Sequence, residues 1–312
     1  MACVPGDVDG NRENADAMLA RAAVQGAELA LLPELALNGY VLSAGLWTQA
    51  EPIGGPLTRW LCDAARRYRL HLGTTLIEAA GDHFHNSFLL ATPGGEIAGV
   101  ARKSRPAWVE ARWYRGVRGP HVIDTAIGRI GVGICYENYL AGPLRTLAQA
   151  SPALVLQPTA AATPPAAWPI GAHGAAAFDA MLARLAEDHA RALDVPVVMA
   201  NMCGDHEVAG FATRFPGLSS IVSGGGEIQA RLGGKEGVIA ADVTLGGERA
   251  DPGGVGRLRY WTAPMPWYAP AWPVAQHLCA VGYRFDGVRR RSARVASGAA
   301  ARTGSSIRPR ES

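Results

Sequence analysis

Three side chains that could do chemistry together stand at the ends of separate apolar runs. Glu34 ends the stretch LLPE, Lys103 ends VARK and Cys135 ends GVGIC. Side chains at strand ends of layered α/β proteins commonly project into a shared cleft. A cation beside a thiol favours the thiolate, and a nearby carboxylate can carry its proton. These residue types therefore predict nucleophilic catalysis by Cys135, with Glu34 and Lys103 as its ionic partners.

Lysine usage singles out the same segment. The chain has 28 arginines and only two lysines, Lys103 and Lys235. Lys103 stands between Arg102 and Arg105, where another arginine would fit the local pattern. An ammonium is a compact charge that can sit against a reacting centre, whereas a guanidinium is a wide, permanently charged fork. We therefore expect Lys103 to be required as lysine.

The elements that must hold these side chains are predicted to be alternating strands and helices. The run 29–32 has four consecutive apolar residues, which indicates a strand buried on both faces that ends at Pro33-Glu34. Strands that alternate with helices and hairpins favour an α/β layered domain. The expected helices are 11–26, 55–69, 143–150 and 175–193, and the expected strands are 29–32, 72–77, 87–91, 96–100, 122–124, 130–134, 154–157, 195–200, 218–222, 227–232 and 238–243.

Composition indicates one large domain followed by a tail. The chain has 312 residues and is 48% hydrophobic, enough to bury a substantial core, and we expect this domain at 1–285. The stretch 286–312 is rich in Arg, Ser and Ala, with little to bury, so we expect it to be disordered. The tail carries the excess of basic residues behind the net charge of +3. The charge of the domain itself therefore gives no reason to expect a nucleic-acid partner.

Hydropathy and cysteine usage indicate a cytoplasmic protein. No apolar run is long enough to span a membrane, and the first residues lack the basic opening and apolar stretch of a signal peptide. The five cysteines are scattered and show no CxxC spacing, which suggests neither a disulfide framework nor a zinc site. A cysteine with a special role here is therefore expected to act as a thiol.

Three segments resemble signatures of the nitrilase/amidase superfamily of carbon–nitrogen hydrolases. LLPELALNGY contains Glu34, GEIAGVARKSRPAWVE contains Lys103, and GRIGVGICYENY contains Cys135. The later stretches FPGLSSIVSGGGEIQAR and EGVIAADV are similar to the closing strand pairs of that family. The resemblance covers nearly the whole globular part and keeps the signatures in order. It implies a four-layer αββα sandwich and a homodimer or higher homo-oligomer.

The resemblance also implies a role for each site residue. Glu34 is then the general base and Cys135 the nucleophile. Lys103, together with the backbone N–H of Tyr136, stabilises the developing oxyanion. Ammonia or an amine leaves, and water activated by Glu34 hydrolyses the thioester. No metal or organic cofactor is implied, and the partner is a small-molecule amide or nitrile.

Four further residues are candidates for supporting the site. Glu110 stands seven residues after Lys103, where many relatives carry a second glutamate that helps position the lysine and the substrate. Thr159 is a pocket candidate by similarity. Trp108 and Trp168 are candidates for lining the pocket, although aromatic residues in loops often serve only packing.

The substrate branch is less sharply indicated than the mechanism. Nitrilases favour a tryptophan after the nucleophile and a threonine and an arginine after the lysine, whereas this chain has Tyr136, Ala107 and Ala111. These departures favour amide-type substrates. A nitrile converted to a carboxylic acid and ammonia is the first alternative, and an N-carbamoyl compound is the second.

Readings from other classes fit less well. A serine hydrolase would need a Gly-x-Ser-x-Gly turn, and a metallohydrolase would need more than the single close pair His83 and His85. A degenerate family member acting as a binding protein is the non-enzyme alternative, against which the intact Glu34, Lys103 and Cys135 stand. The family resemblance also implies an apolar strand before Gly6-Asp7-Val8. That strand is missing or very short here, so we expect an exposed edge of the sheet, or a start codon assigned too late.

Overall fold

The structure is a computed structural model that describes residues 1–119, 121–208, 211–246 and 265–285. The stretch 286–312, for which disorder is expected, lies outside the described residues. Within them, no helix is long and apolar enough to cross a membrane.

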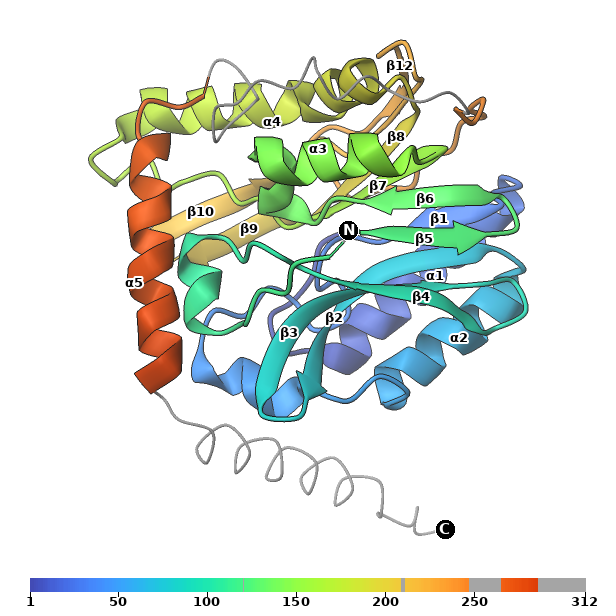
Figure 1. Cartoon of the computed structure of the whole chain (residues 1–312), viewed down its shortest axis with the longest axis horizontal. Helices are drawn as coiled ribbons and strands as arrows, with labels where there is room; N and C mark the ends of the chain where they lie inside the picture. The colour runs from blue at the N-terminus through green and yellow to red at the C-terminus, as the bar shows by residue number, and fades with distance from the viewer. Residues whose placement is uncertain (120, 209–210, 247–264, 286–312) are drawn as a thin grey trace, which may run out of the picture.

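Two β-sheets pack face to face, and helices cover their outer sides (Figure 1). Helices α1 and α2 lie on the outer side of the first sheet, and α3 and α4 on that of the second. This arrangement is the layered α/β class expected from the sequence. The first sheet has the order β1 (Leu29–Leu31), β2 (His71–Ala80), β3 (His83–Ala91) and β4 (Ile97–Arg102). The second has the order β12 (Ile228–Arg231), β11 (Ser220–Val222), β8 (Val197–Asn201), β7 (Leu154–Thr159), β6 (Gly128–Val132) and β5 (Val122–Thr125).

The helices form where the sequence combines apolar spacing with suitable ends. In α2 (Pro56–Tyr68), Pro56 occupies the first turn, where its missing N–H is tolerated, and the buried side chains lie on one face. In α1 (Val8–Val24), the Asp7 side chain accepts a hydrogen bond from the N–H of Gly10 and caps the helix start. The remaining α-helices are α3 (Ala141–Ala150), α4 (Gly171–Leu193) and α5 (Trp272–Phe285).

Several elements were not predicted. They are the hairpin of β9 (Cys203–Val208) and β10 (Phe211–Pro216), the helix α5, and the short 3-10 helices η1 (Ala44–Gln49), η2 (Trp108–Arg112), η3 (Cys135–Tyr139) and η5 (Ala269–Ala271). The β9 segment CGDHEV has no apolar alternation, so its sequence carries no strand signal. The short helices depend on side-chain contacts that local periodicity does not encode.

Two expectations about strands are wrong. The run 29–32 was expected to be buried on both faces, but the three residues of β1 are only half-buried. The expected strand 238–243 is not a strand in the structure. Among the described strands β1 pairs only with β2, so it lies at the edge of its sheet, and 238–243 pairs with no strand. Apolar composition alone therefore did not provide the neighbours that bury a strand on both faces or pair its backbone.

A cavity of about 940 Å³ adjoins both segments. We call it the edge groove. Its lining includes β1, residues 237–243 and Leu245. Met18 and Leu19 of α1 and Val198 and Ile221 of the second sheet also line it. Glu34, Lys103 and Cys135 are not among its lining residues, so the edge groove is separate from the candidate chemistry.

Candidate active site

The structure brings together the acidic and basic side chains that the sequence singled out. Glu34 follows β1, Lys103 directly follows β4, and Cys135 begins η3 just after β6. Lys103 Nζ lies 2.6 Å from Glu34 Oε1, and both side chains are fully buried. A buried ion pair is stable only when its remaining polar atoms are also satisfied. The surrounding contacts meet that requirement.

Glu110 is the second carboxylate on the lysine. Its Oε2 lies 2.6 Å from Lys103 Nζ and accepts a hydrogen bond of 2.7 Å from the N–H of Ala107. Its Oε1 accepts a hydrogen bond of 2.8 Å from the Tyr40 hydroxyl. Glu110 belongs to η2, so this short helix fixes the second side of the lysine. The structure therefore places the Glu110 carboxylate against the Lys103 ammonium.

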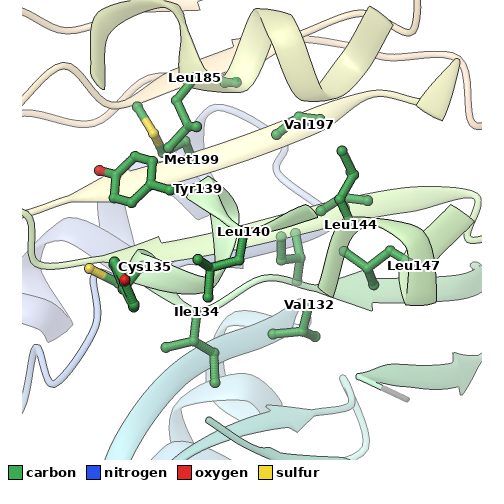
Figure 2. Close-up of a cluster of buried hydrophobic side chains, with 14 of the residues drawn as sticks. Val132, Ile134, Cys135, Tyr139, Leu140, Leu144, Leu147, Leu185, Val197 and Met199 are labelled. Atoms are coloured by element: carbon green, nitrogen blue, oxygen red, sulfur yellow. The ribbon is translucent and has the colours of Figure 1, made fainter. Parts of the chain in front are cut away.

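Cys135 adjoins the same cluster through its thiol. Glu34, Lys103 and Glu110 lie close enough for their charges to influence the pKa of this thiol. Figure 2 shows its sulfur pointing away from Leu140, which packs in the apolar core behind it. The backbone of Cys135 has φ +49°, a left-handed conformation that is unfavourable for residues other than glycine. Such strain, held by the surrounding fold, is typical of functional positions.

Burial and charge set the protonation of the cluster. Burial is the largest influence on Glu34, and with the nearby Glu110 it raises the pKa of that carboxyl to about 7, despite the opposing effect of Lys103. Burial, and then the charge of Glu34, raise the pKa of the Cys135 thiol well above its usual value. Burial alone would lower the pKa of Lys103, but Glu110 and Glu34 outweigh it and raise that pKa. The resting site therefore holds a charged lysine, a protonated thiol and a carboxylate that can exchange a proton near neutral pH.

Asn86 holds Glu34 in place, and sequence reasoning missed it. Its Nδ2 donates a hydrogen bond of 2.7 Å to Glu34 Oε1, and its backbone oxygen accepts one of 2.8 Å from the N–H of Lys103. The N–H of Ala160 donates to Glu34 Oε2 at 3.1 Å. Asn86 lies in the middle of β3, where its only sequence signal is a polar residue within a buried strand.

Glu137 was also missed, and it joins the nucleophile segment to the lysine segment. Its Oε1 accepts hydrogen bonds from the backbone N–H of Ser104, at 2.7 Å, and from the Ser104 hydroxyl. Its Oε2 accepts one of 3.1 Å from the N–H of Ile134 and lies 3.4 Å from His121 Nδ1. Burial opposes the charge of Glu137, but His121 and Ser104 lower the pKa of its carboxyl. Glu137 therefore sits as a carboxylate between the residues that precede Cys135 and follow Lys103.

The remaining residues predicted from the sequence make packing or backbone contacts around the cluster. They are Thr159, Tyr136, Trp108 and Trp168. Thr159 is buried at the end of β7, where its backbone oxygen lies 3.4 Å from the N of Glu34 but its hydroxyl donates to the oxygen of Gln157. Tyr136 is buried, and its ring lies 5.9 Å from that of Trp272. The Trp108 and Trp168 rings meet edge to face at 5.6 Å. In the described part of the chain, no three or more His, Cys, Asp or Glu side chains are grouped so that they could hold a metal ion.

Known proteins named as a nitrilase and as an amidase are similar to this chain. Nitrilase 1 of Arabidopsis thaliana is 30% identical over 152 residues, which are 42% of this chain and 44% of that protein. This chain thus aligns with less than half the length of that relative. N-carbamoylputrescine amidase of Solanum tuberosum is 27% identical over 253 residues, 77% of this chain and 82% of that protein.

A solved structure agrees with the fold. It is a variant of the amidase from Nesterenkonia sp. AN1, with the acetamide moiety of fluoroacetamide covalently added at its active-site cysteine. The two structures have a TM-score of 0.62 at 25% identity, over 76% of this chain and 84% of that one. The sequence model of the family described as carbon-nitrogen hydrolase matches residues 1–252. The chain therefore belongs to the carbon-nitrogen hydrolase family.

Proposed function

We propose that this protein hydrolyses an amide-type carbon–nitrogen bond of a small molecule through a thioester on Cys135. The observation that carries the proposal is the buried contact of Lys103 with Glu34 and Glu110, beside the thiol. A carboxylate with a pKa of about 7 next to a thiol is suited to take its proton at neutral pH. Such a cluster is a costly arrangement for a protein that only binds.

The proposed reaction has two halves. Glu34 takes the proton of Cys135, the thiolate adds to the substrate carbonyl carbon, and Lys103 stabilises the oxygen that becomes negative. The carbon–nitrogen bond breaks as Glu34 returns the proton to the leaving ammonia or amine. Water then gives a proton to Glu34 and adds to the thioester, and the thiol leaves with that proton. A carboxylic acid and a free enzyme result.

Two comparisons support this chemistry. The solved amidase variant carries the acetamide moiety of fluoroacetamide on its active-site cysteine, so the cysteine of that protein reacts with an electrophilic carbon, as proposed here for Cys135. The relative that aligns over the largest share of this chain among those described above is an amidase of an N-carbamoyl compound. The amidase names of both proteins support amide-type substrates as the first candidates, with N-carbamoyl compounds as the second alternative.

Nitriles are the runner-up substrate class. A nitrile would form a thioimidate on the same cysteine, so the charged cluster serves both reactions and the pocket must decide. Tyr136 packs against Trp272, and Ala107 and Ala111 are both buried beside Glu110. The small side chains leave this part of the site without the threonine and arginine that nitrilases favour. This difference favours amides.

Cellular setting and assembly complete the proposal. A reduced, cytoplasmic environment suits an enzyme that depends on a free thiol. A homo-oligomer is expected, and Val274, Leu278 and Phe285 of α5 are exposed apolar side chains suited to subunit contact. The charged cluster is formed by residues of one chain, so the chemistry can be tested without knowing the oligomeric state.

Mass spectrometry of the intact protein tests the chemistry directly. Incubation with an amide should add the mass of its acyl group to the wild type and not to Cys135→Ala. Ammonia release from matched amide, nitrile and N-carbamoyl compounds that share one acyl group should be fastest for the amide. Faster turnover of nitriles across several pairs would reverse the substrate order. The absence of both adduct and ammonia across the panel would favour a binding protein.

A further inference from the structure

Helix α5 runs alongside the segments that carry the proposed chemistry (Figure 1). It begins at Trp272, beyond residue 252 where the family match ends. In Figure 1 it stands upright at one side of the sandwich. Its contacts reach the nucleophile segment, the lysine segment and the start of β3.

The first turn of α5 contacts the nucleophile segment. The Trp272 ring is buried and lies 5.9 Å from the Tyr136 ring and 6.3 Å from the Tyr139 ring. Both tyrosines belong to η3, which Cys135 begins. Aromatic rings at these distances and angles attract one another beyond the area that they bury. The first turn of α5 therefore fixes the residues that follow the nucleophile.

The far end of α5 contacts the start of β3. The Tyr283 hydroxyl accepts a hydrogen bond of 3.2 Å from the N–H of Phe84 and lies 3.4 Å from His83 Nδ1. Gly282 approaches η2 so closely that a Cβ atom there would lie 2.9 Å from Arg112 Cδ. Both ends of the helix are thus held, so its middle has a defined position.

The middle of α5 reaches the lysine segment through a single peptide group. Gln276 Nε2 donates a hydrogen bond of 2.7 Å to the oxygen of Pro106. The N–H at the other end of that peptide group belongs to Ala107 and donates to Glu110 Oε2 at 2.7 Å. The same Oε2 lies 2.6 Å from Lys103 Nζ. A line of hydrogen bonds therefore connects Gln276 to the lysine, and hydrogen bonds in such a line polarise one another.

We propose that Gln276 is a positioning residue, which acts through the 106–107 peptide on Glu110 and thereby on Lys103. The peptide group is planar, so holding its oxygen from outside also sets the direction of its N–H inside the site. Without that hold, the peptide can rotate and Glu110 loses a donor on the oxygen that faces the lysine. The inference rests on the proposed function for its effect on turnover, but not for its effect on the Cys135 thiol.

Two substitutions at Gln276 test the inference. Gln276→Leu removes the donor while keeping similar bulk, and Gln276→Glu places a carboxylate against the Pro106 oxygen. We expect kcat to fall on the order of tenfold or more in Gln276→Leu, because misplacing reacting groups by ~1 Å can slow a reaction about 10²-fold. KM and the melting temperature should stay close to wild type. His277→Ala changes an exposed neighbour on the same helix and is the control.

The pH response separates positioning from packing. A protonated carboxyl can donate to the Pro106 oxygen, so the activity of Gln276→Glu, as a ratio to wild type, should rise toward acid pH. Gln276→Leu should show no such rise. A purely structural role of the side chain would give both variants the same flat ratio, and that result would overturn the inference.

Alkylation of Cys135 by iodoacetamide, followed by peptide mass spectrometry, keeps the test independent of turnover. We expect slower alkylation in Gln276→Leu, because Glu110 would no longer hold Lys103 in its place near the thiol. If the wild type hydrolyses none of the compounds tested, the proposed function fails, and the alkylation rates still decide the role of Gln276. Wild-type kcat and alkylation rate in Gln276→Leu would show that the residue does not position the site.

Discussion

Individual charges in the site do not balance, and that imbalance shapes its chemistry. Lys103 supplies one positive charge to two buried carboxylates, Glu34 and Glu110. An excess negative charge in a buried site is unfavourable, so a proton near neutral pH relieves it. The pKa of Glu34 is raised to about 7, so this carboxyl can take that proton. In the proposed mechanism Glu34 also accepts the proton of the Cys135 thiol, so relief of charge and proton transfer use the same residue.

Lys103→Arg should inactivate the enzyme although it keeps the charge. The ammonium lies 2.6 Å from a carboxylate on each side and is fully buried, so the wider guanidinium would have to displace Glu34 or Glu110. We expect kcat to fall on the order of 10²-fold or more, comparable to losing an oxyanion donor. Steady-state kinetics on an amide give the measurement. Lys235→Arg, at an exposed position, should be nearly silent, and near-wild-type turnover in Lys103→Arg would remove the lysine from the chemistry.

The acid limb of the pH–rate profile should report Glu34. Its carboxyl must be ionised to take the proton of Cys135, and its pKa is raised to about 7. The value of kcat/KM should therefore fall as pH drops through about 7, rather than near the usual glutamate value of about 4.3. Initial rates between pH 5 and 9 measure this limb. A flat profile down to pH 5 would show that another group accepts the proton.

Secondary structure elements show what the sequence could and could not predict. Glu34, Lys103 and Cys135 were predicted because each follows an apolar run and strand ends in layered sheets converge, and the structure brings Glu34 and Lys103 into contact. Asn86 and Glu137 were not found, because a buried polar residue within an element shows no partner in the sequence. Gln276 contacts Pro106 across 170 positions, and no local pattern encodes such a contact. The segment 238–243 has the composition of a strand but lacks the neighbour that would make it one.

Glu137→Gln should loosen the junction between η3 and the lysine segment. An amide in place of the carboxylate has only one acceptor oxygen, so one of the backbone donors at Ser104 and Ile134 would face an N–H₂ group. An unsatisfied buried donor costs about 1–3 kcal/mol. Urea unfolding measures the loss of stability. Glu13→Gln, on the exposed face of α1, should stay within about 0.5 kcal/mol of wild type. Equal stability of the two variants would contradict the linking role.

At the scale of the whole molecule, the candidate active site and the edge groove are formed by different residues. The charged cluster is formed by side chains that follow strands of both sheets. The lining of the edge groove does not include these site residues. We therefore expect turnover and aggregation at high protein concentration to depend on different residues. A substitution can then change one of them without changing the other.

The edge groove implies that aggregation at high protein concentration depends on the short strand β1. Among the described strands, β1 pairs on one edge only, and its other edge faces no strand. Backbone groups at such an edge are a template for another extended chain, so we expect concentrated solutions to aggregate by strand addition at the edge groove. A lysine in the channel disfavours such pairing, and Ala240→Lys, at an exposed lining position, should lower light scattering during storage. Ala176→Lys on α4 adds the same charge at an exposed position outside the groove and should scatter as the wild type does. Equal suppression by both lysines would assign the effect to net charge. If only Ala240→Lys lowers light scattering and its kcat is unchanged, then aggregation during storage can be reduced without loss of activity.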